Sequence, residues 1–143
     1  MGRVGLLACL LLTAQASAAE PIVGKWHLDR QELNGKPVNA EPLVLQVRPS
    51  GEELAFKFSL PVNNIYFVSM SYTVHLDGAE GDVKNARDES IGKIKMTRAG
   101  ASQYKLTIRG PNRPASNGTL TVSPDGKTLT SESETVKQTF SRY

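Results

Sequence analysis

The protein has 143 residues, a length that favours a single domain. Its 17 basic and 14 acidic side chains leave a net charge of +3 at pH 7, which is too small a bias to indicate a nucleic-acid partner. Cys9 is the single cysteine, so the composition excludes a disulfide framework and a cysteine-based zinc site.

The N-terminal segment 1–19 has the pattern of a secretory signal peptide. Arg3 supplies a positive charge, and the apolar run 4–12 is much shorter than the roughly 20 residues that span a bilayer. Small residues before position 20 fit the site that signal peptidase cleaves. Cys9 faintly resembles a lipid-attachment site, but the apolar run continues beyond it and favours a residue inside the signal peptide. We therefore expect a mature domain over 20–143, exported to the periplasm or the extracellular space.

Alternating apolar and polar residues, interrupted by turn residues, dominate the mature chain. The longest run, 65–76, places its apolar residues on one face and predicts a long strand. Residues 30–41 are expected to form a polar loop, and residues 77–89 an acidic loop with room for a short strand at 82–84. The other expected strands cover 22–28, 43–48, 54–60, 93–97, 104–109, 119–123, 128–133 and 136–143.

Eight to ten short strands joined mostly by tight turns predict an all-β, antiparallel domain. About 124 mature residues suit an up-and-down β-barrel, and a small β-sandwich is the alternative. Closure of a barrel removes the exposed strand edges that invite aggregation. A barrel of roughly eight strands is either filled by its own side chains or holds one small ligand.

Two stretches resemble a known group of proteins. Gly24-Lys25-Trp26 in the first strand is similar to the Gly-x-Trp pattern of lipocalins. Ser123-Pro124-Asp125-Gly126-Lys127 resembles the late hairpin of exported bacterial proteins of uncharacterised function that are described as lipocalin-like. The resemblance implies a lipocalin-like barrel. It also implies that Arg142 stacks on Trp26 and closes one barrel end beside Gly24, with a cation–π contact worth roughly 0.5–2 kcal/mol.

The inward-facing aromatic and methionine side chains are the candidates for ligand binding. They either pack a dry core or line a cavity for a small apolar molecule, where methionine adapts its shape and tyrosine offers a hydroxyl group. The alternation assigns eight of them to the barrel interior: Phe56, Phe58, Tyr66, Met70, Tyr72, Met96, Tyr104 and Phe140.

Motifs for catalysis, metal binding and cofactor binding are not found in the sequence. His27 and His75 lie on polar faces, and neither has a second histidine at metal-ligand spacing. The acidic loop 77–89 does not match the EF-hand pattern for calcium. The sequence contains no nucleophile elbow and no glycine-rich phosphate loop. We therefore expect no enzyme, metal or cofactor; a site built from His75 and Asp77 is the remaining catalytic alternative.

The sequence favours an exported, lipocalin-like binding protein whose partner is a small apolar ligand. The alternative is a dry-core interaction module of the cell envelope that acts through its outer face and the loops 30–41 and 77–89; its protein partner is unknown. Neither a nucleic-acid partner nor a transmembrane segment in the mature protein is expected. An interior cavity above roughly 300 Å³, the lower range for ligand pockets, distinguishes the two hypotheses.

Overall fold

The computed structural model describes residues 20–112 and 114–143, so the expected signal peptide lies outside the described residues. Eleven strands account for the regular secondary structure of this part of the chain. Within it, no helical segment has the length and hydrophobicity needed to traverse a bilayer. The strands are β1 (Gly24–Leu33), β2 (Lys36–Val38), β3 (Val44–Ser50), β4 (Glu53–Val62), β5 (Ile65–Val74), β6 (Gly81–Asn85), β7 (Ser90–Arg98), β8 (Gln103–Arg109), β9 (Ser116–Val122), β10 (Thr128–Ser133) and β11 (Val136–Arg142).

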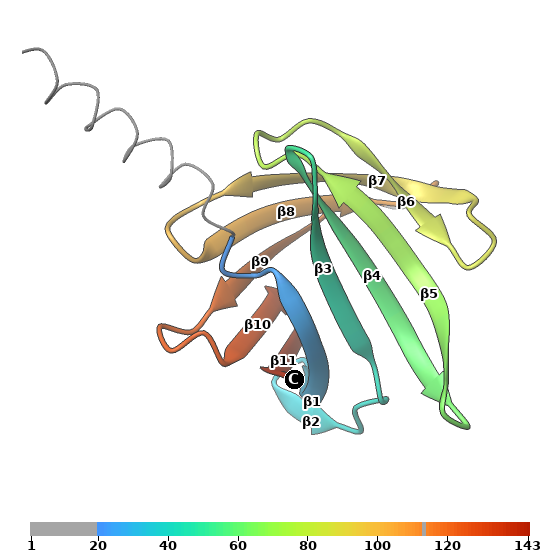
Figure 1. The fold of residues 1–143 in the computed structure, drawn as a ribbon, viewed down its shortest axis with the longest axis vertical. Coiled ribbons are helices and arrows are strands. Elements are labelled where there is room, and N and C mark those ends of the chain that lie inside the picture. The colour runs from blue at the N-terminus through green and yellow to red at the C-terminus, as the bar shows by residue number, and fades with distance from the viewer. Residues whose placement is uncertain (1–19, 113) are drawn as a thin grey trace, which may run out of the picture.

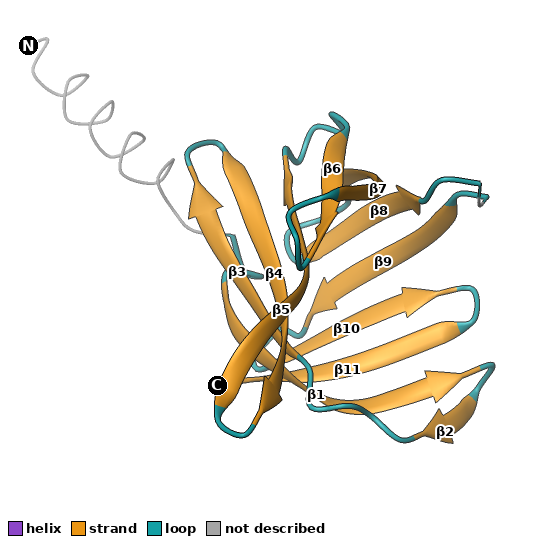
Figure 2. Ribbon diagram, turned by 90° about the vertical axis from the view of Figure 1, so that its right-hand side faces the viewer, coloured by secondary structure: helices purple, strands orange, loops and turns teal. Residues whose placement is uncertain are grey.

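The strands form one antiparallel sheet that closes on itself (Figure 1). From β3 to β11 each strand pairs with the next one in the chain, and β1 joins β3 to β11 to complete the ring. β2 pairs only with β1 and lies outside the ring of ten strands. Figure 2 shows β3 to β5 crossing the direction of β9 to β11, so the barrel has two crossing layers. The prediction of an antiparallel barrel is confirmed.

The expected polar loop at 30–41 contains strand structure instead. β1 continues to Leu33, and β2 returns along it after a tight turn at Asn34 and Gly35, which have φ angles of 52° and 79°. The polar end of β1 is held by backbone pairing with β11, from Arg30 opposite Thr139 onward. The polar side chains therefore indicated a solvated strand extension rather than a loop. The short strand expected at 82–84 is present as part of β6.

The long alternating segment forms β5, but a bulge divides it. Phe58 pairs with Met70, whereas the next residue of β4, Ser59, pairs with Val68. Ser69 is therefore an additional residue in β5 that has no counterpart in β4. Such a bulge reverses which side chains face the interior on its two sides.

The bulge makes the prediction of an inward-facing Tyr66 wrong. Met70 and Tyr72, after the bulge, border the barrel interior. Tyr66, before it, is 50% exposed and lies on the outer face with the Lys25 ammonium 5.2 Å from its ring centroid. Alternation read from the sequence assumes an unbroken period of two, and nothing in the sequence marked the additional residue.

Candidate functional site: the barrel interior

One end of the barrel is sealed around Trp26, whose side chain is fully buried. Trp26 pairs with Arg142 between β1 and β11, and the guanidinium carbon lies 4.1 Å from the centroid of the indole ring. The indole Nε1 donates a hydrogen bond to the Ile22 carbonyl at 3.0 Å. The stack of Arg142 on Trp26 that the resemblance implied is therefore present.

The guanidinium of Arg142 also bonds to the backbone of neighbouring segments at this end. It donates hydrogen bonds to the backbone carbonyls of Gly126 at 2.7 Å, Val23 at 2.8 Å and Pro21 at 2.8 Å. Gly24 lies directly under it with a φ of +146°, and a Cβ at this position would overlap the Nη1 atom of Arg142. A glycine is required here both for its backbone conformation and for the close approach of the guanidinium.

Glu20 completes the sealed end, although the sequence analysis did not identify it. Its carboxylate accepts a hydrogen bond from the Tyr104 hydroxyl at 3.0 Å and forms an ion pair with Arg98. Burial and the neighbouring Glu20 carboxylate both raise the pKa of Tyr104. The partners Glu20 and Tyr104 are 84 positions apart, so local patterns in the sequence do not reveal the contact.

The barrel interior contains a cavity of about 400 Å³, partly open to solvent, away from the sealed end. This volume falls within the range of small-molecule pockets. Strands on both sides of the barrel contribute to its wall. The wall is formed by Leu43, Leu45, Phe56, Phe58, Ser69, Met70, Tyr72, Ile91, Ile94, Leu106, Ile108, Leu120, Ser131, Gln138 and Phe140.

The structure brings most of the predicted interior side chains to this cavity. Met96 and Tyr104 are fully buried but belong to the packed core rather than to the cavity wall. Tyr66 lies on the outer face, as described above. Five of the eight border the cavity: Phe56, Phe58, Met70, Tyr72 and Phe140.

An aromatic cluster forms one side of the cavity. The rings of Phe56 and Tyr72 are stacked with centroids 4.9 Å apart and an interplanar angle of 24°, and Phe58 lies 5.8 Å from Tyr72. Burial raises the pKa of Tyr72, because an apolar environment disfavours the ionised hydroxyl. In the described part of the chain, the Tyr72 hydroxyl makes no hydrogen bond to the protein, and it lines the cavity.

Two polar side chains that the sequence analysis did not propose also border the cavity. Ser131 of β10 and Gln138 of β11 pair directly across the sheet. Ser131 lies two residues after the buried Leu129, and Gln138 lies two residues before the buried Phe140, so both face inward. This spacing is the signal that could have identified them. Their inward orientation was not predicted, because polar residues on a strand normally face water.

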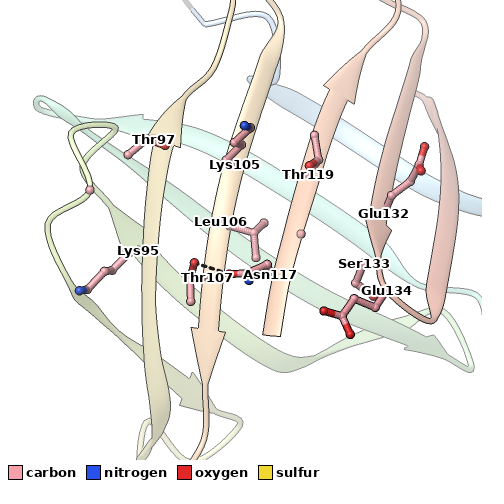
Figure 3. A pocket seen from close by; sticks show the side chains of 12 residues that line it. Lys95, Thr97, Lys105, Leu106, Thr107, Asn117, Thr119, Glu132, Ser133 and Glu134 are labelled. Carbon is pink, nitrogen blue, oxygen red and sulfur yellow. Dashed lines mark hydrogen bonds between the residues drawn. The ribbon is translucent and has the colours of Figure 1, made fainter. Parts of the chain in front are cut away.

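A larger hollow of about 780 Å³ lies on the outer face of β7, β8 and β9. Polar and charged residues form most of its wall, with Lys95 and Lys105 on one side, Glu132 on the other, and a hydrogen bond of 2.8 Å from the Thr107 hydroxyl to Asn117 (Figure 3). Most small-molecule sites have walls that are more apolar than this one. The interior cavity is therefore the better candidate site despite its smaller volume.

The two histidines lie on the surface, each beside one carboxylate. His27 lies 2.9 Å from Asp29, and His75 lies 3.3 Å from Glu53. Asp77, the suggested partner of His75, instead accepts a hydrogen bond from the backbone of Ala79. Residues 20–112 and 114–143 contain no group of three or more histidine, cysteine or acidic side chains arranged to hold a metal ion.

The sequence matches neither a known protein-family model nor a curated protein. Its structure, in contrast, is similar to several solved structures. An abundant heat soluble (SAHS) protein of Ramazzottius varieornatus is 19% identical with a TM-score of 0.65, covering 88% of this chain and 98% of its own. A Schistosoma mansoni fatty acid binding protein in complex with arachidonic acid is 17% identical, with a TM-score of 0.61 and coverages of 86% and 96%.

Zebrafish ileal bile acid-binding protein complexed with cholic acid is a third similar structure. It is 19% identical, has a TM-score of 0.59, and the match covers 87% of this chain and all of the zebrafish chain. The chain has the fold of these lipocalin-like barrels. At such low identity the similarity establishes the fold alone, so the ligand of this chain must be inferred from its own cavity.

Proposed function

We propose that this protein is an exported, lipocalin-like carrier that binds a small apolar molecule inside its barrel. The observation that carries the proposal is the interior cavity of about 400 Å³, whose wall is mainly aliphatic and aromatic. A core packed only for stability has few voids larger than a water molecule. The volume also exceeds the limit of roughly 300 Å³ that separates a ligand-binding barrel from a dry-core module.

The proposal is supported by what the similar structures hold. Arachidonic acid and cholic acid are small, mostly apolar molecules, and each is in complex with a protein of this fold. The N-terminal segment 1–19, with the pattern of a signal peptide, supports export. Binding is favoured over catalysis because the cavity wall joins apolar side chains to a few neutral polar groups.

The experiment is a titration with N-phenyl-1-naphthylamine, a neutral apolar dye whose fluorescence rises in an apolar environment. The mature protein, 20–143, is expected to show saturable binding. Ser131→Phe fills the cavity and is expected to weaken dye binding by about tenfold or more. Thr130→Phe, which places the same ring on the outer face of the same strand, is the matched control and is expected to change the affinity by less than about twofold.

Both variants are first checked for an intact fold by circular dichroism and thermal unfolding. If folded protein shows no saturable binding of the dye, the proposed function is wrong. If the two variants weaken binding equally, the dye binds elsewhere on the surface and the cavity is not the site.

A further inference from the structure

The cavity wall is electrically neutral. Each side chain that borders the cavity is uncharged at neutral pH, and its polar members are two serines, one glutamine and Tyr72. At the sealed end, the guanidinium of Arg142 directs its donors to three backbone carbonyls and its face to Trp26. A ligand in the cavity therefore meets neutral groups.

Three of these neutral polar groups are available to a ligand. Ser69 already donates a hydrogen bond to the Phe58 carbonyl at 3.2 Å. In the described part of the chain, the side chains of Tyr72, Ser131 and Gln138 make no such bond, while each fully buried side-chain nitrogen or oxygen has a partner. The three groups are thus accessible from the cavity rather than enclosed in its wall.

The position of these groups in the ring of strands places them around the cavity. Tyr72 lies on β5, whereas Ser131 and Gln138 lie on β10 and β11. In a ring of ten strands, β5 and β10 are opposite each other. An elongated ligand that crosses the cavity can therefore reach Tyr72 with one part and the serine–glutamine pair with another.

We propose that the cavity selects a neutral ligand, an apolar molecule with an alcohol, carbonyl or amide group bound by Gln138 and Ser131, and discriminates against the corresponding carboxylate. This inference rests on the proposed function and specifies its ligand. Glutamine and serine each donate and accept hydrogen bonds, so they satisfy a hydroxyl or a carbonyl group equally well. An ionised carboxylate in the same place loses its hydration without a cation to compensate for it.

The test compares two probes that differ only at one end. 1-Decanol and decanoate compete for the site against N-phenyl-1-naphthylamine at pH 8, where the carboxylic acid is ionised. 1-Decanol is expected to displace the dye at a concentration about tenfold or more below that needed with decanoate. If decanoate competes within about threefold of 1-decanol, the inference is wrong.

A charge placed in the cavity should reverse the preference. Gln138→Arg adds a guanidinium to the wall, and decanoate is expected to gain about tenfold in affinity while 1-decanol loses affinity. The matched control is Thr139→Arg, which adds the same charge at the next residue of β11, on its other face. If Gln138→Arg fails to fold, Ser131→Lys makes the same test from β10.

The outcomes separate the two proposals. Absence of dye binding overturns both the carrier function and its neutral ligand. Dye binding with equal competition by the two probes leaves the carrier intact and overturns only the neutral ligand. Equal gains of decanoate affinity in Gln138→Arg and Thr139→Arg show that surface charge attracts the anion, and this result overturns the assignment of Gln138 to the polar group of the ligand.

Discussion

Tyr104 and Tyr72 are both buried tyrosines of the barrel interior, but their hydroxyl groups have different surroundings. The hydroxyl of Tyr104 donates to the Glu20 carboxylate at 3.0 Å, in the sealed end around Trp26. The hydroxyl of Tyr72 belongs to the cavity wall and has no partner in the described part of the chain. The same residue type is thus bonded within the protein in one region and open to the cavity in the other.

The difference indicates that the sealed end stabilises the fold, whereas the cavity wall is suited to binding. Each fully buried side-chain nitrogen or oxygen in the described part of the chain has a partner, so the Tyr72 hydroxyl is open to the cavity and its lack of a protein partner costs little stability. At the sealed end the guanidinium of Arg142, the indole of Trp26 and the carboxylate of Glu20 all have partners. The cavity wall keeps unpaired groups, which suits a surface that a ligand completes.

The largest expected effect is at the sealed end. Trp26→Ala removes a fully buried indole and the face on which Arg142 stacks, and should lower the free energy of unfolding by about 3–5 kcal/mol. Phe58→Ala, in the half-buried cavity wall, should cost less, because its ring already borders empty space. Denaturant unfolding of both variants measures the difference. Equal losses would contradict the division between the two regions.

Gly24→Ala should lower the free energy of unfolding by about 2 kcal/mol. The added methyl group overlaps the guanidinium of Arg142, which cannot move aside without losing its bonds to three carbonyls. Gly51→Ala is the control, because Gly51 also has a positive φ, +64°, but open space around it. Its loss should be about 1 kcal/mol, from backbone strain alone. If thermal and denaturant unfolding show the same loss in both, the close approach at Gly24 contributes nothing.

Removal of each tyrosine hydroxyl tests the comparison directly. Tyr104→Phe leaves the Glu20 carboxylate without one partner and should cost about 1–2 kcal/mol in the free energy of unfolding. Tyr72→Phe removes a hydroxyl without a partner, and should change the stability of the ligand-free protein by less than about 0.5 kcal/mol in either direction. Chemical unfolding of the two variants, side by side, gives the result. A loss in Tyr72→Phe as large as that in Tyr104→Phe would show that the cavity wall is satisfied internally.

The barrel could be predicted from the sequence because its signals are local and repeated. Alternating side chains and tight turns indicate consecutive antiparallel strands, and the closure of such strands into a ring removes the free edges. The stack of Arg142 on Trp26 could be predicted because both residues match positions of the lipocalin pattern that the sequence resembles. The strand at 30–33 was not predicted, because its stability comes from backbone pairing with β11 and not from apolar side chains.

The cavity wall could be predicted only in part. Phe56, Phe58 and Phe140 follow from alternation, because an apolar side chain on an alternating strand faces the interior. Gln138 does not, because a polar side chain in the same position is normally taken as solvent-facing. Tyr66 was misplaced because a bulge depends on the pairing of two strands, which the sequence of one strand does not contain.

The smallest expected effect is the dependence of stability on alkaline pH. Burial raises the pKa of both Tyr72 and Tyr104 above the ordinary value of about 10. Near pH 10 the unfolded chain therefore binds fewer protons at these sites than the folded chain, and the free energy of unfolding falls as the pH rises. The loss at pH 10 should be about 0.4 kcal/mol for each tyrosine relative to pH 8. Denaturant unfolding at the two pH values measures it, and the double variant Tyr72→Phe with Tyr104→Phe should lose this part of the dependence. An unchanged dependence in the double variant would show that the two hydroxyls ionise equally in the folded and unfolded chains, which would remove the evidence that either is shielded from water.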